Sequence, residues 1–331
     1  MRSFTVNAND AGQRLDKFVS KACPMIPQSG MYKAIRTKKI KINRKRCEIS
    51  TRLCEGDVVD IYLPDDMLVI PDKDDFTAAS SDIDIIYEDE NILLVNKPSG
   101  LSVHEDDRSG ADTLINRLKR YLSDKGEYDA DSEHSFAPAL CNRIDRNTDG
   151  IVIAAKNAES LRLMNEIIKE REIDKRYLCI TVGTPPKDSD IITAYLYKDE
   201  KTNTVTVSDR STPANKKIIT GYTVIGTNDG LSLADIRLYT GRTHQIRAHM
   251  AHIGCPLLGD GKYGDNRINR SRGMRSQALS SYGLTFSFRT GHGRLSYLDG
   301  KSFTISDNET KRLWDKLCGQ VQPMRRGTEK K

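Results

Sequence analysis

The chain has 331 residues, of which 30% are charged and 6% aromatic, and a formal net charge of +6, which is typical of a soluble protein with two or more domains. No apolar run approaches the roughly 20 residues of a membrane-spanning helix, and the first seven residues lack the apolar core of a secretory signal. The seven cysteines are scattered and show no Cys-x-x-Cys spacing, which argues against a disulfide framework and favours a reducing, cytoplasmic location.

Residues 1–63 predict a small α+β domain with a strongly basic surface. Apolar residues from 15 to 22 recur at the spacing of one helical face, and residues 39–43 and 58–63 have the pattern of strands. Residues 1–62 contain 13 Lys and Arg against 6 Asp and Glu. Such a concentration predicts a polyanion as partner, with a merely solvated face as the alternative. Its centre consists of eight basic residues without an acidic one: Lys33, Arg36, Lys38, Lys39, Lys41, Arg44, Lys45 and Arg46.

A second, larger domain is expected over residues 83–318. Residues 64–82 combine prolines, aspartates and small residues, which indicates a linker. Within the larger domain, residues 123–135 predict an exposed polar excursion, and residues 190–240 predict short antiparallel strands. No glycine-rich phosphate loop follows any predicted strand, so we expect no nucleotide cofactor. Residues 319–331 predict a disordered basic tail.

The most informative stretch is residues 142–150, which precede a buried apolar strand. It places Asp145 between Arg143 and Arg146 and then turns sharply through Asn-Thr-Asp-Gly. Nearby positive charge favours the ionised form of a carboxyl group, so Asp145 is a candidate for a site that binds an anion. The alternative of equal weight is a capping aspartate with two solvated arginines.

A second dense motif covers residues 239–260. Thr243 is predicted to cap a helix that ends at Gly254, with Arg247 in its first turn. Arg242 and Arg247 are candidates for anion contact or for a salt bridge to Asp145.

The same motif contains three histidines and a cysteine, a set that raises the question of a metal. His249 and His252 are one helical turn apart and could chelate an ion. However, His244 and His249 lie on different faces of the predicted helix, and no acidic ligand is nearby. We therefore expect the histidines to cap, pack and form hydrogen bonds, with no bound metal.

Several motifs occur together in a specific order. They are residues 96–100 (Asn-Lys-Pro-Ser-Gly), 143–150, 175–177 (Lys-Arg-Tyr), 241–249 and 277–279 (Gln-Ala-Leu). In this order they resemble the catalytic domain of the RluA-class pseudouridine synthases. Residues 14–16, 40–43 and 56–59 resemble an S4-like RNA-binding domain. Together the resemblances span about residues 12–305.

The resemblance implies an α+β fold with a mixed, largely antiparallel pseudouridine-synthase sheet and flanking helices, preceded by the small S4-like domain. It implies isomerisation of specific uridines to pseudouridine by base flipping, without metal or cofactor. The substrate would be structured RNA, with large-subunit (23S) ribosomal RNA favoured and transfer RNA possible. We expect the protein to act as a monomer.

The resemblance also assigns roles to particular residues. Asp145 is implied as the catalytic aspartate and Arg247 as its basic partner. Tyr177 is implied to lie under the flipped base as a candidate general base at C5, for which its pKa must be lowered. Arg143 would enter the space left by the flipped uridine. A further set is expected to contact RNA: Arg242, His244 and the eight basic residues between 33 and 46.

The chain departs from the family pattern at a few positions. Asn142, Ile144 and Asp149 stand where the family usually has His, Leu and Ser, and Arg44 stands where it usually has Gly. Asp149 brings a negative charge close to Asp145 in sequence. These departures motivate a different function as the alternative: a catalytically silent RNA-binding protein that acts in ribosome assembly. The basic loop 261–276 is expected to grip RNA rather than to be a mobile surface loop.

Overall fold

The computed structural model describes residues 1–69, 76–105, 110–202 and 204–319. Contacts divide the chain into two compact units, which are described separately. The first unit combines residues 1–94, 102–142 and 153–165, and the second combines residues 95–101, 143–152 and 166–331. Among the described residues, every helix is too short or too polar to cross a membrane.

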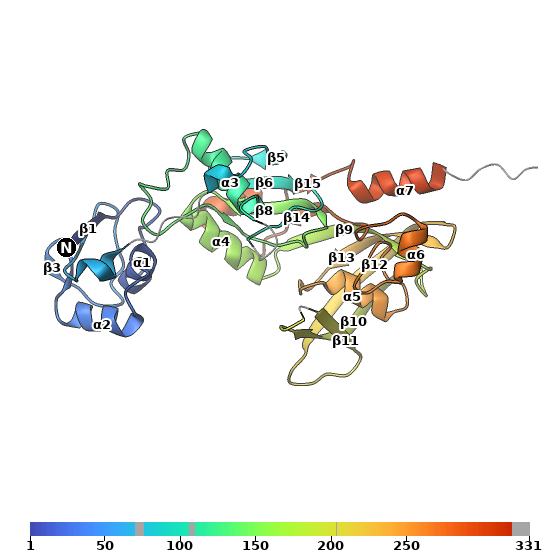
Figure 1. The fold of residues 1–331 in the computed structure, drawn as a ribbon, viewed down its shortest axis with the longest axis horizontal. Helices are drawn as coiled ribbons and strands as arrows, with labels where there is room; N and C mark the ends of the chain where they lie inside the picture. Colours follow the sequence, from blue (N-terminus) through green and yellow to red (C-terminus); the bar gives the residue numbers. More distant parts are fainter. Residues whose placement is uncertain (70–75, 106–109, 203, 320–331) are drawn as a thin grey trace, which may run out of the picture. The chain divides into compact units, whose positions relative to one another are not determined.

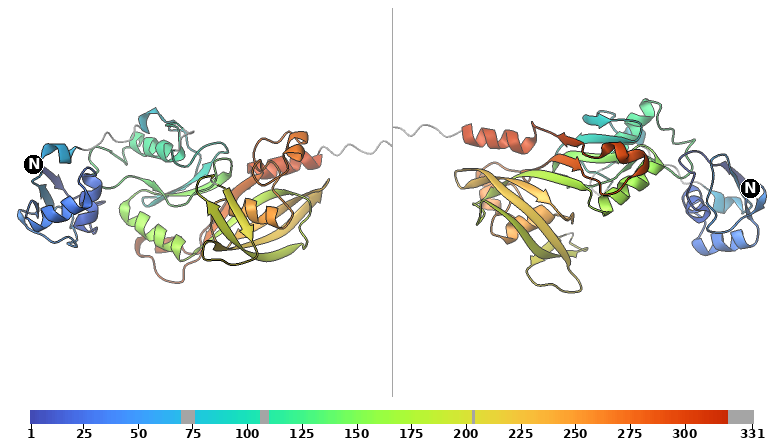
Figure 2. Two further views of the ribbon diagram at one scale, coloured as in Figure 1. Left: turned by 60° about the horizontal axis from the view of Figure 1, so that its bottom comes forward. Right: turned by 180° about the vertical axis from the view of Figure 1, so that it is seen from behind.

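The N-terminal module of the first unit is a small sheet packed against two helices (Figures 1 and 2). Its sheet has the order β1-β4-β2-β3, with antiparallel neighbours. The predicted amphipathic helix is α1, and Phe4, Phe18 and Ile61 lie in a closed apolar core below it. The elements are β1 (Arg2–Thr5), α1 (Leu15–Ala22), α2 (Gln28–Arg36), β2 (Ile40–Ile42), β3 (Lys45–Arg46) and β4 (Val58–Ile61).

The turn between β2 and β3 uses two residues with positive φ. Asn43 has φ 50°, as its side chain type allows, and Arg44 has φ 62°. This pair of left-handed residues is the geometry that suits a two-residue hairpin loop. The Asn43 side chain fixes the turn, because it accepts a hydrogen bond from the backbone N–H of Val58 (2.9 Å) and donates one to Asp57 (2.7 Å). The hairpin therefore forms although glycine is absent.

The predicted linker and the predicted excursion both contain anchored residues. In η1 (Asp65–Leu68), Leu68 is buried in the core of the N-terminal module. In η2 (Phe76–Ala78), the ring of Phe76 lies 5.9 Å from that of Tyr128. Ser135 donates a hydrogen bond to the buried Asp10 (2.5 Å), so the end of the excursion at 123–135 is held rather than free. Residues 70–75 of the predicted linker lie outside the described residues.

Within the described residues, 11 strands form one mixed sheet. Its order is β11-β10-β12-β13-β9-β14-β8-β6-β5, with β7 beside β8 and β15 beside β14. The neighbours are antiparallel from β11 to β14, whereas β14 and β8 run parallel. The mixed, largely antiparallel fold is thereby confirmed. The strands are β5 (Ile85–Glu88), β6 (Ile92–Lys97), β7 (Ala139–Leu140), β8 (Asp149–Ala155), β9 (Ile173–Val182), β10 (Ser189–Asp199), β11 (Thr204–Ser208), β12 (Lys216–Asn228), β13 (Leu231–Leu238), β14 (Leu279–Phe286) and β15 (Ser302–Thr304).

Helices flank this sheet. In the second unit, α7 packs Trp314 against Leu178 and Ile180, which alternate along β9 toward one face of the sheet. Tyr177, which directly precedes Leu178 in the alternation, therefore points to the opposite face. The predicted tail at 319–331 lies outside the described residues apart from Gly319. The remaining helices are α3 (Leu114–Asp124), α4 (Ala158–Lys169), α5 (Gln245–His252), α6 (Asn266–Ser271), η3 (Gly293–Leu298) and α7 (Glu309–Gly319).

Candidate active site

The loop that carries Asp145 is fixed from below by a buried lysine. Lys97, at the end of β6, is 0% exposed. Its ammonium group donates hydrogen bonds to three backbone carbonyl groups, one of which belongs to Arg146 (2.8 Å). The backbone N–H of Gly100 donates to the same carbonyl group (2.9 Å). Two residues of the Asn-Lys-Pro-Ser-Gly motif, Lys97 and Gly100, thus fix the backbone of Arg146, the residue that follows Asp145.

Burial and nearby carboxylates have opposite effects on the charge of Lys97. Burial lowers the pKa of Lys97 to about 8, while the carboxylates of Asp149, Glu309 and Asp145 favour its charged form. Only the ammonium form has a proton for each of the three carbonyl acceptors. The charge of Lys97 and the conformation of the loop therefore depend on each other.

A glycine lets the loop enter the sheet. Gly150 has φ 115°, and a Cβ atom there would lie 2.1 Å from the carbonyl oxygen of Ser281. Gly150 and Ser281 face each other in the parallel pair of β8 and β14. Only glycine permits this approach of the two backbones, and so the turn that follows Asp145 is sterically specified.

The carboxylate of Asp145 is held by an arginine from α5. Arg247 donates from Nη1 to Asp145 Oδ2 (2.9 Å), which confirms the predicted salt bridge. The same guanidinium binds Asp260 with two parallel hydrogen bonds (2.7 and 2.9 Å). The side chain of Asp260 is 0% exposed, that of Arg247 10% and that of Asp145 25%. We call this set, Asp145, Arg247 and Asp260, the arginine clamp.

Within the clamp, the pairing of Arg247 with Asp260 favours the charged form of both residues. Burial opposes the charge of Arg247, but the hydrogen bonds and charges of Asp260 and Asp145 outweigh it and raise the pKa of Arg247 above its ordinary value. Burial would raise the pKa of Asp260, yet Arg247 and two backbone N–H groups lower it below its ordinary value. Asp260 thus neutralises one side of the guanidinium, and the other side is directed at Asp145.

A tyrosine supports the clamp from behind. The guanidinium of Arg247 lies over the ring of Tyr263, 5.3 Å from its centre. The hydroxyl group of Tyr263 is hydrogen-bonded to Nδ1 of His244 (2.8 Å) and accepts a hydrogen bond from the backbone N–H of Val205 (3.1 Å). Burial lowers the pKa of His244, although the Asp145 carboxylate opposes this. His244, expected from the sequence to contact RNA, therefore also positions Tyr263.

Tyr177 lies in β9 at an irregularity of the neighbouring strand. The register of β14 against β9 shifts between Ser280 and Gly283, a bulge that lies opposite Tyr177. The bulge brings Ser281 into hydrogen-bonding contact with the phenol. Burial, together with the charge of Asp145, raises the pKa of Tyr177 to about 12, against the effect of Ser281. The surroundings thus do not provide the lowered pKa that the sequence-based role as a base requires.

The other arginines predicted for the site are exposed. Neither Arg143 nor Arg146 forms an ion pair with Asp145 within the described residues; Arg146 instead donates from Nε to the carbonyl group of Gly100 (2.9 Å). Arg242 is exposed as well. The positive charge beside Asp145 therefore comes from Arg247 and not from the arginines adjacent in sequence.

The helix that supplies Arg247 begins later than predicted. The expected cap at Thr243 is wrong: α5 begins at Gln245, and the preceding residue, His244, has φ 53° and makes no capping hydrogen bond. Instead, the side chain of Gln245 accepts hydrogen bonds from Thr240 Oγ1 (2.9 Å) and from the backbone N–H of Arg242 (3.1 Å). Gln245 thus reaches back to a backbone N–H three residues earlier, as the glutamine of a capping box does.

The histidines of this helix have partners of their own. His249 bonds Thr220 through Nδ1 (2.9 Å), and burial lowers the pKa of His249 to about 4. His252 bonds Asp209 through Nε2 (2.8 Å). In the part of the chain that the structure describes, no group of three or more His, Cys, Asp or Glu residues is arranged to hold a metal ion.

The residues that depart from the family pattern are accommodated. Asn142 accepts a hydrogen bond from the backbone N–H of Ile153 (2.7 Å), and Ile144 is buried. The carboxylate of Asp149 accepts hydrogen bonds from Ser280 Oγ (2.6 Å) and from the backbone N–H of Glu309 (3.2 Å). Burial still raises the pKa of Asp149. The added carboxylate is thus bound to its own donors and does not compete for Arg247.

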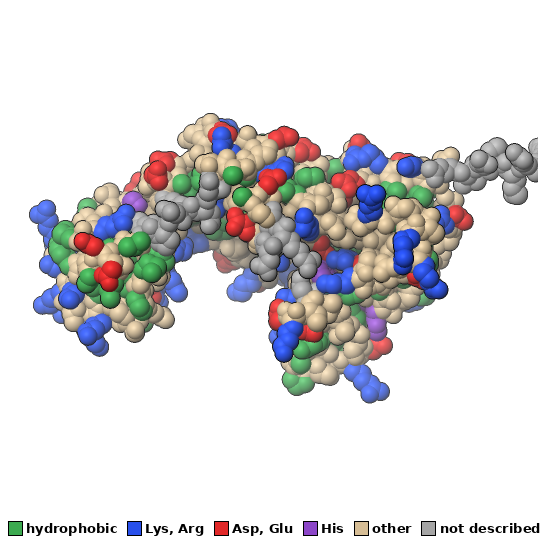
Figure 3. All heavy atoms as spheres, in the orientation of Figure 1, with side chains coloured by type: hydrophobic (Ala, Val, Ile, Leu, Met, Phe, Trp, Pro, Cys, Tyr) green, Lys and Arg blue, Asp and Glu red, His purple; other side chains and the backbone are tan. Residues whose placement is uncertain are grey.

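The eight basic residues of the N-terminal module, its basic face, lack carboxylate partners among the residues that the structure describes. Seven of its eight basic side chains are exposed, and Lys41 is half-buried with its ammonium group over the ring of Tyr62 (5.3 Å). Within residues 1–69 and the rest of the described chain, none of the eight pairs with a carboxylate. Figure 3 shows Lys and Arg side chains at the margin of this module. An unneutralised cluster of this kind suits the phosphates of a nucleic acid.

Sequence reasoning missed three contributors to the site. Asp260 follows an apolar stretch and a glycine, but nothing in its spacing pointed to Arg247, 13 residues earlier. Tyr263 and Lys97 likewise gave only weak signals: an aromatic residue in a glycine-rich loop, and a lysine in an apolar strand. The burial of Lys97 required knowledge of the carbonyl groups that meet around it.

Comparison with known proteins agrees with this site. Residues 91–252 match the family described as RNA pseudouridylate synthase, and residues 13–59 match the S4 domain. An uncharacterised RNA pseudouridine synthase of Mycoplasma genitalium is 34% identical over 86% of this chain and 88% of its own length. The ribosomal large subunit pseudouridine synthase C of Rickettsia bellii is 33% identical over 80% of this chain and 87% of its own.

Solved structures show the same fold. Human RNA pseudouridylate synthase domain containing 4 aligns with a TM-score of 0.53 at 20% identity, covering 68% of this chain and 89% of the human one. Human RNA pseudouridylate synthase domain containing 1 aligns with a TM-score of 0.51 at 22% identity, covering 73% and 97%.

The class of protein defined by these matches is an isomerase that acts on RNA. The chain belongs to the RNA pseudouridine synthase family and carries an S4 domain at residues 13–59, as its motifs predicted.

Proposed function

We propose that the protein isomerises specific uridines of large-subunit ribosomal RNA to pseudouridine, with Asp145 as the catalytic carboxylate. The observation that carries this proposal is the arginine clamp, in which Arg247 donates a hydrogen bond to the partly exposed Asp145 while Arg247 and Asp260 are buried. The relatives from Rickettsia bellii and Vibrio vulnificus that are named ribosomal large subunit pseudouridine synthase C support this choice of RNA. Transfer RNA is the other substrate class to be tested.

The chemistry matches the groups that are present. The reaction breaks the bond between C1′ and N1 of the uridine and forms a bond between C1′ and C5. A base removes the C5 proton, and N1 gains a proton, so that the product is an isomer of the substrate. Asp145 supplies a carboxylate for the sugar face, where positive character develops. Arg247 fixes the orientation of that carboxylate. Tyr177 lies close enough to Asp145 for that charge to help raise its pKa, and it is proposed to support the base and to accept the C5 proton.

The target uridine must leave the RNA stack to reach such a site. Arg143 is exposed on the loop beside Asp145 and is proposed to occupy the space that the base leaves. Arg242 and His244 border the same site and are proposed to contact the RNA backbone. The S4 domain would bind structured RNA through the phosphates, which position the protein without reading sequence.

We further propose that the protein acts as a monomer in the cytoplasm, without metal or cofactor. Asp145, Tyr177 and Arg247 all belong to one compact unit of one chain, so no second copy is needed to complete the constellation. The scattered cysteines suit a reducing compartment.

The test is pseudouridine mapping by carbodiimide-dependent reverse-transcription stops. Ribosomal and transfer RNA are compared between a strain that lacks the gene, its parent, and the deletion strain that expresses wild-type protein or Asp145→Asn. We expect stops at particular uridines of large-subunit RNA to disappear in the deletion strain and to return only with the wild-type protein. Stops lost in transfer RNA instead would move the substrate to that class.

The purified Asp145→Asn protein separates catalysis from binding. We expect it to form no product but to bind RNA within about three-fold of the wild-type affinity, because its neutral side chain keeps the same shape. Turnover by this variant would remove Asp145 from the mechanism. Equal pseudouridine content with and without the gene would favour the silent RNA-binding alternative.

A further inference from the structure

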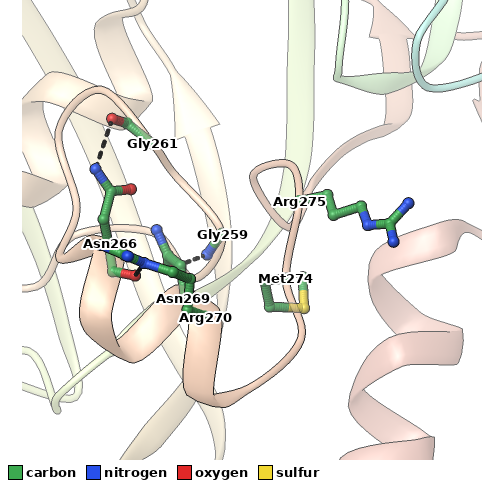
Figure 4. A pocket seen from close by; sticks show the side chains of 7 residues that line it. All are labelled: Gly259, Gly261, Asn266, Asn269, Arg270, Met274 and Arg275. Carbon is green, nitrogen blue, oxygen red and sulfur yellow. Dashed lines mark hydrogen bonds between the residues drawn. The ribbon is translucent and has the colours of Figure 1, made fainter.

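We propose that a pocket beside the arginine clamp binds one unpaired nucleotide of the RNA, distinct from the uridine that is isomerised. The proposal rests on the proposed function, since it concerns the same RNA. The pocket has a volume of 310 Å³ and lies between α6 and the loop that follows it (Figure 4). Its lining consists of Gly259, Gly261, Asn266, Asn269, Arg270, Met274 and Arg275.

The wall of the pocket is bonded directly to the clamp. Asn269 is 4% exposed, accepts a hydrogen bond from the backbone N–H of Gly259 (2.8 Å) and donates one to the carbonyl group of Asp260 (3.1 Å). The side chain of Asp260 in turn holds Arg247, which holds Asp145. A molecule in the pocket is therefore separated from the catalytic carboxylate by only three side chains.

The pocket is built on a backbone that leaves no room for larger residues. Gly259 has φ 80°, and a Cβ atom there would lie 2.0 Å from the carbonyl oxygen of Ser276. A Cβ atom at Gly264 would lie 2.6 Å from the carbonyl oxygen of Asp260. Both glycines are therefore required by close backbone approach, which indicates a preformed loop rather than a loose one.

The charge of the loop is concentrated at this pocket. Arg267 and Arg272 are neutralised by aspartates at 3.0 and 2.8 Å. Arg270 and Arg275, both exposed, have no carboxylate partner anywhere in the described chain. The two unpaired arginines are thus both lining residues, and the side chain of Arg275 points away from the two asparagines (Figure 4). Its charge is therefore available to a phosphate group of the RNA that continues outside the pocket.

The other lining groups suit a base. The amide of Asn266 offers both a donor and an acceptor, and its bond to the carbonyl group of Gly261 is long (3.4 Å). Figure 4 shows Met274 across from the two asparagines. A thioether packs well against a flat aromatic ring. Together these groups recognise the edge and the face of an unstacked base, which is how proteins read single-stranded RNA.

The test fills the pocket without disturbing the fold. Gly261 is exposed and has no positive φ, and an added Cβ atom would lie at an ordinary 3.6 Å from Oδ1 of Asn266, so Gly261→Leu is expected to fold. A second variant, Arg275→Ala, removes one of the unpaired charges. The probe is an unmodified transcript of the large-subunit ribosomal RNA of the source organism. We expect each variant to bind it about ten-fold more weakly, with the single-turnover rate at saturating RNA within two-fold of the wild type.

Matched controls separate the pocket from general effects. Gly291→Leu adds the same side chain at an exposed glycine of another loop, and Arg267→Ala removes a charge from α6 outside the pocket. Both controls should bind within about two-fold of the wild type. Equal losses in pocket and control variants, or wild-type affinity of Gly261→Leu, would overturn the pocket. A wild-type protein that makes no pseudouridine would instead overturn the proposed function.

An abasic scan then identifies the nucleotide. Synthetic RNA fragments centred on the uridine found by the carbodiimide mapping carry a single abasic site at successive positions. At one position, the abasic site should weaken binding by the wild-type protein about ten-fold. Gly261→Leu, which already binds intact RNA more weakly, should bind this abasic RNA no more weakly than intact RNA. If no position shows this coupling, the pocket does not hold a base.

Discussion

The positively charged partner of Asp145 is Arg247, which lies 102 positions later in the chain, and not one of the arginines adjacent to Asp145 in sequence. The arrangement leaves Arg143 exposed, as its proposed contact with RNA requires, and Arg146 bonded to the carbonyl group of Gly100. Asp260 completes the arrangement by fixing the far side of the guanidinium. A buried arginine with one fixed side is a rigid support for the carboxylate on its other side.

Asp260→Asn should weaken the contact that fixes Arg247 beside Asp145. The Asn side chain cannot neutralise the guanidinium, so Arg247 shifts and the orientation of Asp145 is lost. We expect turnover to fall about 100-fold with little change in RNA affinity, and the free energy of unfolding to fall by about 3 kcal/mol at pH 7. Asp174→Asn, which breaks the more exposed pair with Arg237, is the control and should change stability by less than about 1 kcal/mol.

The same variant should change the acid sensitivity of the protein. The pKa of Asp260 lies below its ordinary 3.8 in the folded protein, so its ionised form stabilises the fold above that pH. This stabilisation is lost as the pH falls through the lowered pKa. Denaturant titrations should therefore show the stability difference between wild type and Asp260→Asn shrinking as the pH falls below 3.8. A constant difference would mean that the Asp260 carboxylate does not stabilise the fold through its charge.

For Tyr177, the question is whether its phenolate can act as the base. Its pKa of about 12 leaves roughly one phenol in 10⁵ ionised at pH 7. If the phenolate takes the C5 proton, the single-turnover rate should rise about ten-fold per pH unit between pH 6 and 9. Tyr177→Phe keeps the ring and should bind RNA within about three-fold of wild type. Its rate should be at least about 100-fold lower and independent of pH. A flat wild-type profile would leave Tyr177 with a packing role only.

Among the elements, the β2–β3 hairpin shows how a basic residue is retained at a conformational cost. Arg44 has φ 62°, a region that disfavours side chains with a Cβ atom. The gain is an exposed guanidinium at the tip of the basic face. The turn thus combines a local penalty in stability with an exposed charge, which we propose contacts RNA.

Arg44→Gly should separate the two effects. Relief of the left-handed strain should increase the free energy of unfolding by about 1 kcal/mol. Loss of one cation should lower the slope of log affinity against log salt by about 1. Lys45→Gly removes the same charge from β3, where no positive φ is relieved, and should lower stability while reducing the slope equally. Unfolding and filter-binding measurements on both variants distinguish these outcomes.

The loop of residues 97–101 shows why single motifs in the sequence were hard to interpret. Pro98 cannot continue the strand pairing and Gly100 allows a bend, which explains the end of β6. The role of Lys97, however, depends on three carbonyl groups brought together by folding. Similarly, Thr243 had the residue type of a helix cap, but α5 begins at Gln245, whose side chain bonds back to Thr240 and to the backbone N–H of Arg242. Local propensity decides such cases only where no tertiary partner intervenes.

For the whole molecule, the separation of an RNA-docking face from a catalytic centre leads to a salt-dependence prediction. Replacing Lys38, Lys39 and Lys41 by Gln should reduce the slope of log affinity against log salt by about 2 to 3, because up to three phosphate contacts are lost. The maximal rate at saturating RNA should change little. The slope is measured by filter binding at several salt concentrations.

The control for this prediction removes three lysines that already have partners. Lys187, Lys198 and Lys311 each form an ion pair with a nearby carboxylate. Their replacement by Gln changes the net charge equally but should leave the slope almost unchanged. Equal effects of the two triple variants would reject the N-terminal module as the docking face.

Much of the architecture could be predicted, because periodicity reports burial directly. The helix at residues 15–22 and the antiparallel strands between 190 and 240 follow from apolar spacing alone. The excursion at 123–135 was predicted to be exposed because it is polar, yet Ser135 is bound to a buried aspartate of the N-terminal module. Polarity does not reveal which hydrogen-bonding partner a segment finds. For the same reason, the pairing of Asp260 with Arg247 could not be predicted from the sequence.

The large separation in sequence between Asp145 and Arg247 also affects the order in which the parts of the protein form during synthesis. The core of the N-terminal module closes within residues 4–68, so its RNA-binding face can form early during synthesis. The catalytic constellation must wait until Asp260, and then Ser281 opposite Tyr177, have been made. A nascent chain of this enzyme would thus gain affinity for RNA well before it gains the ability to change it.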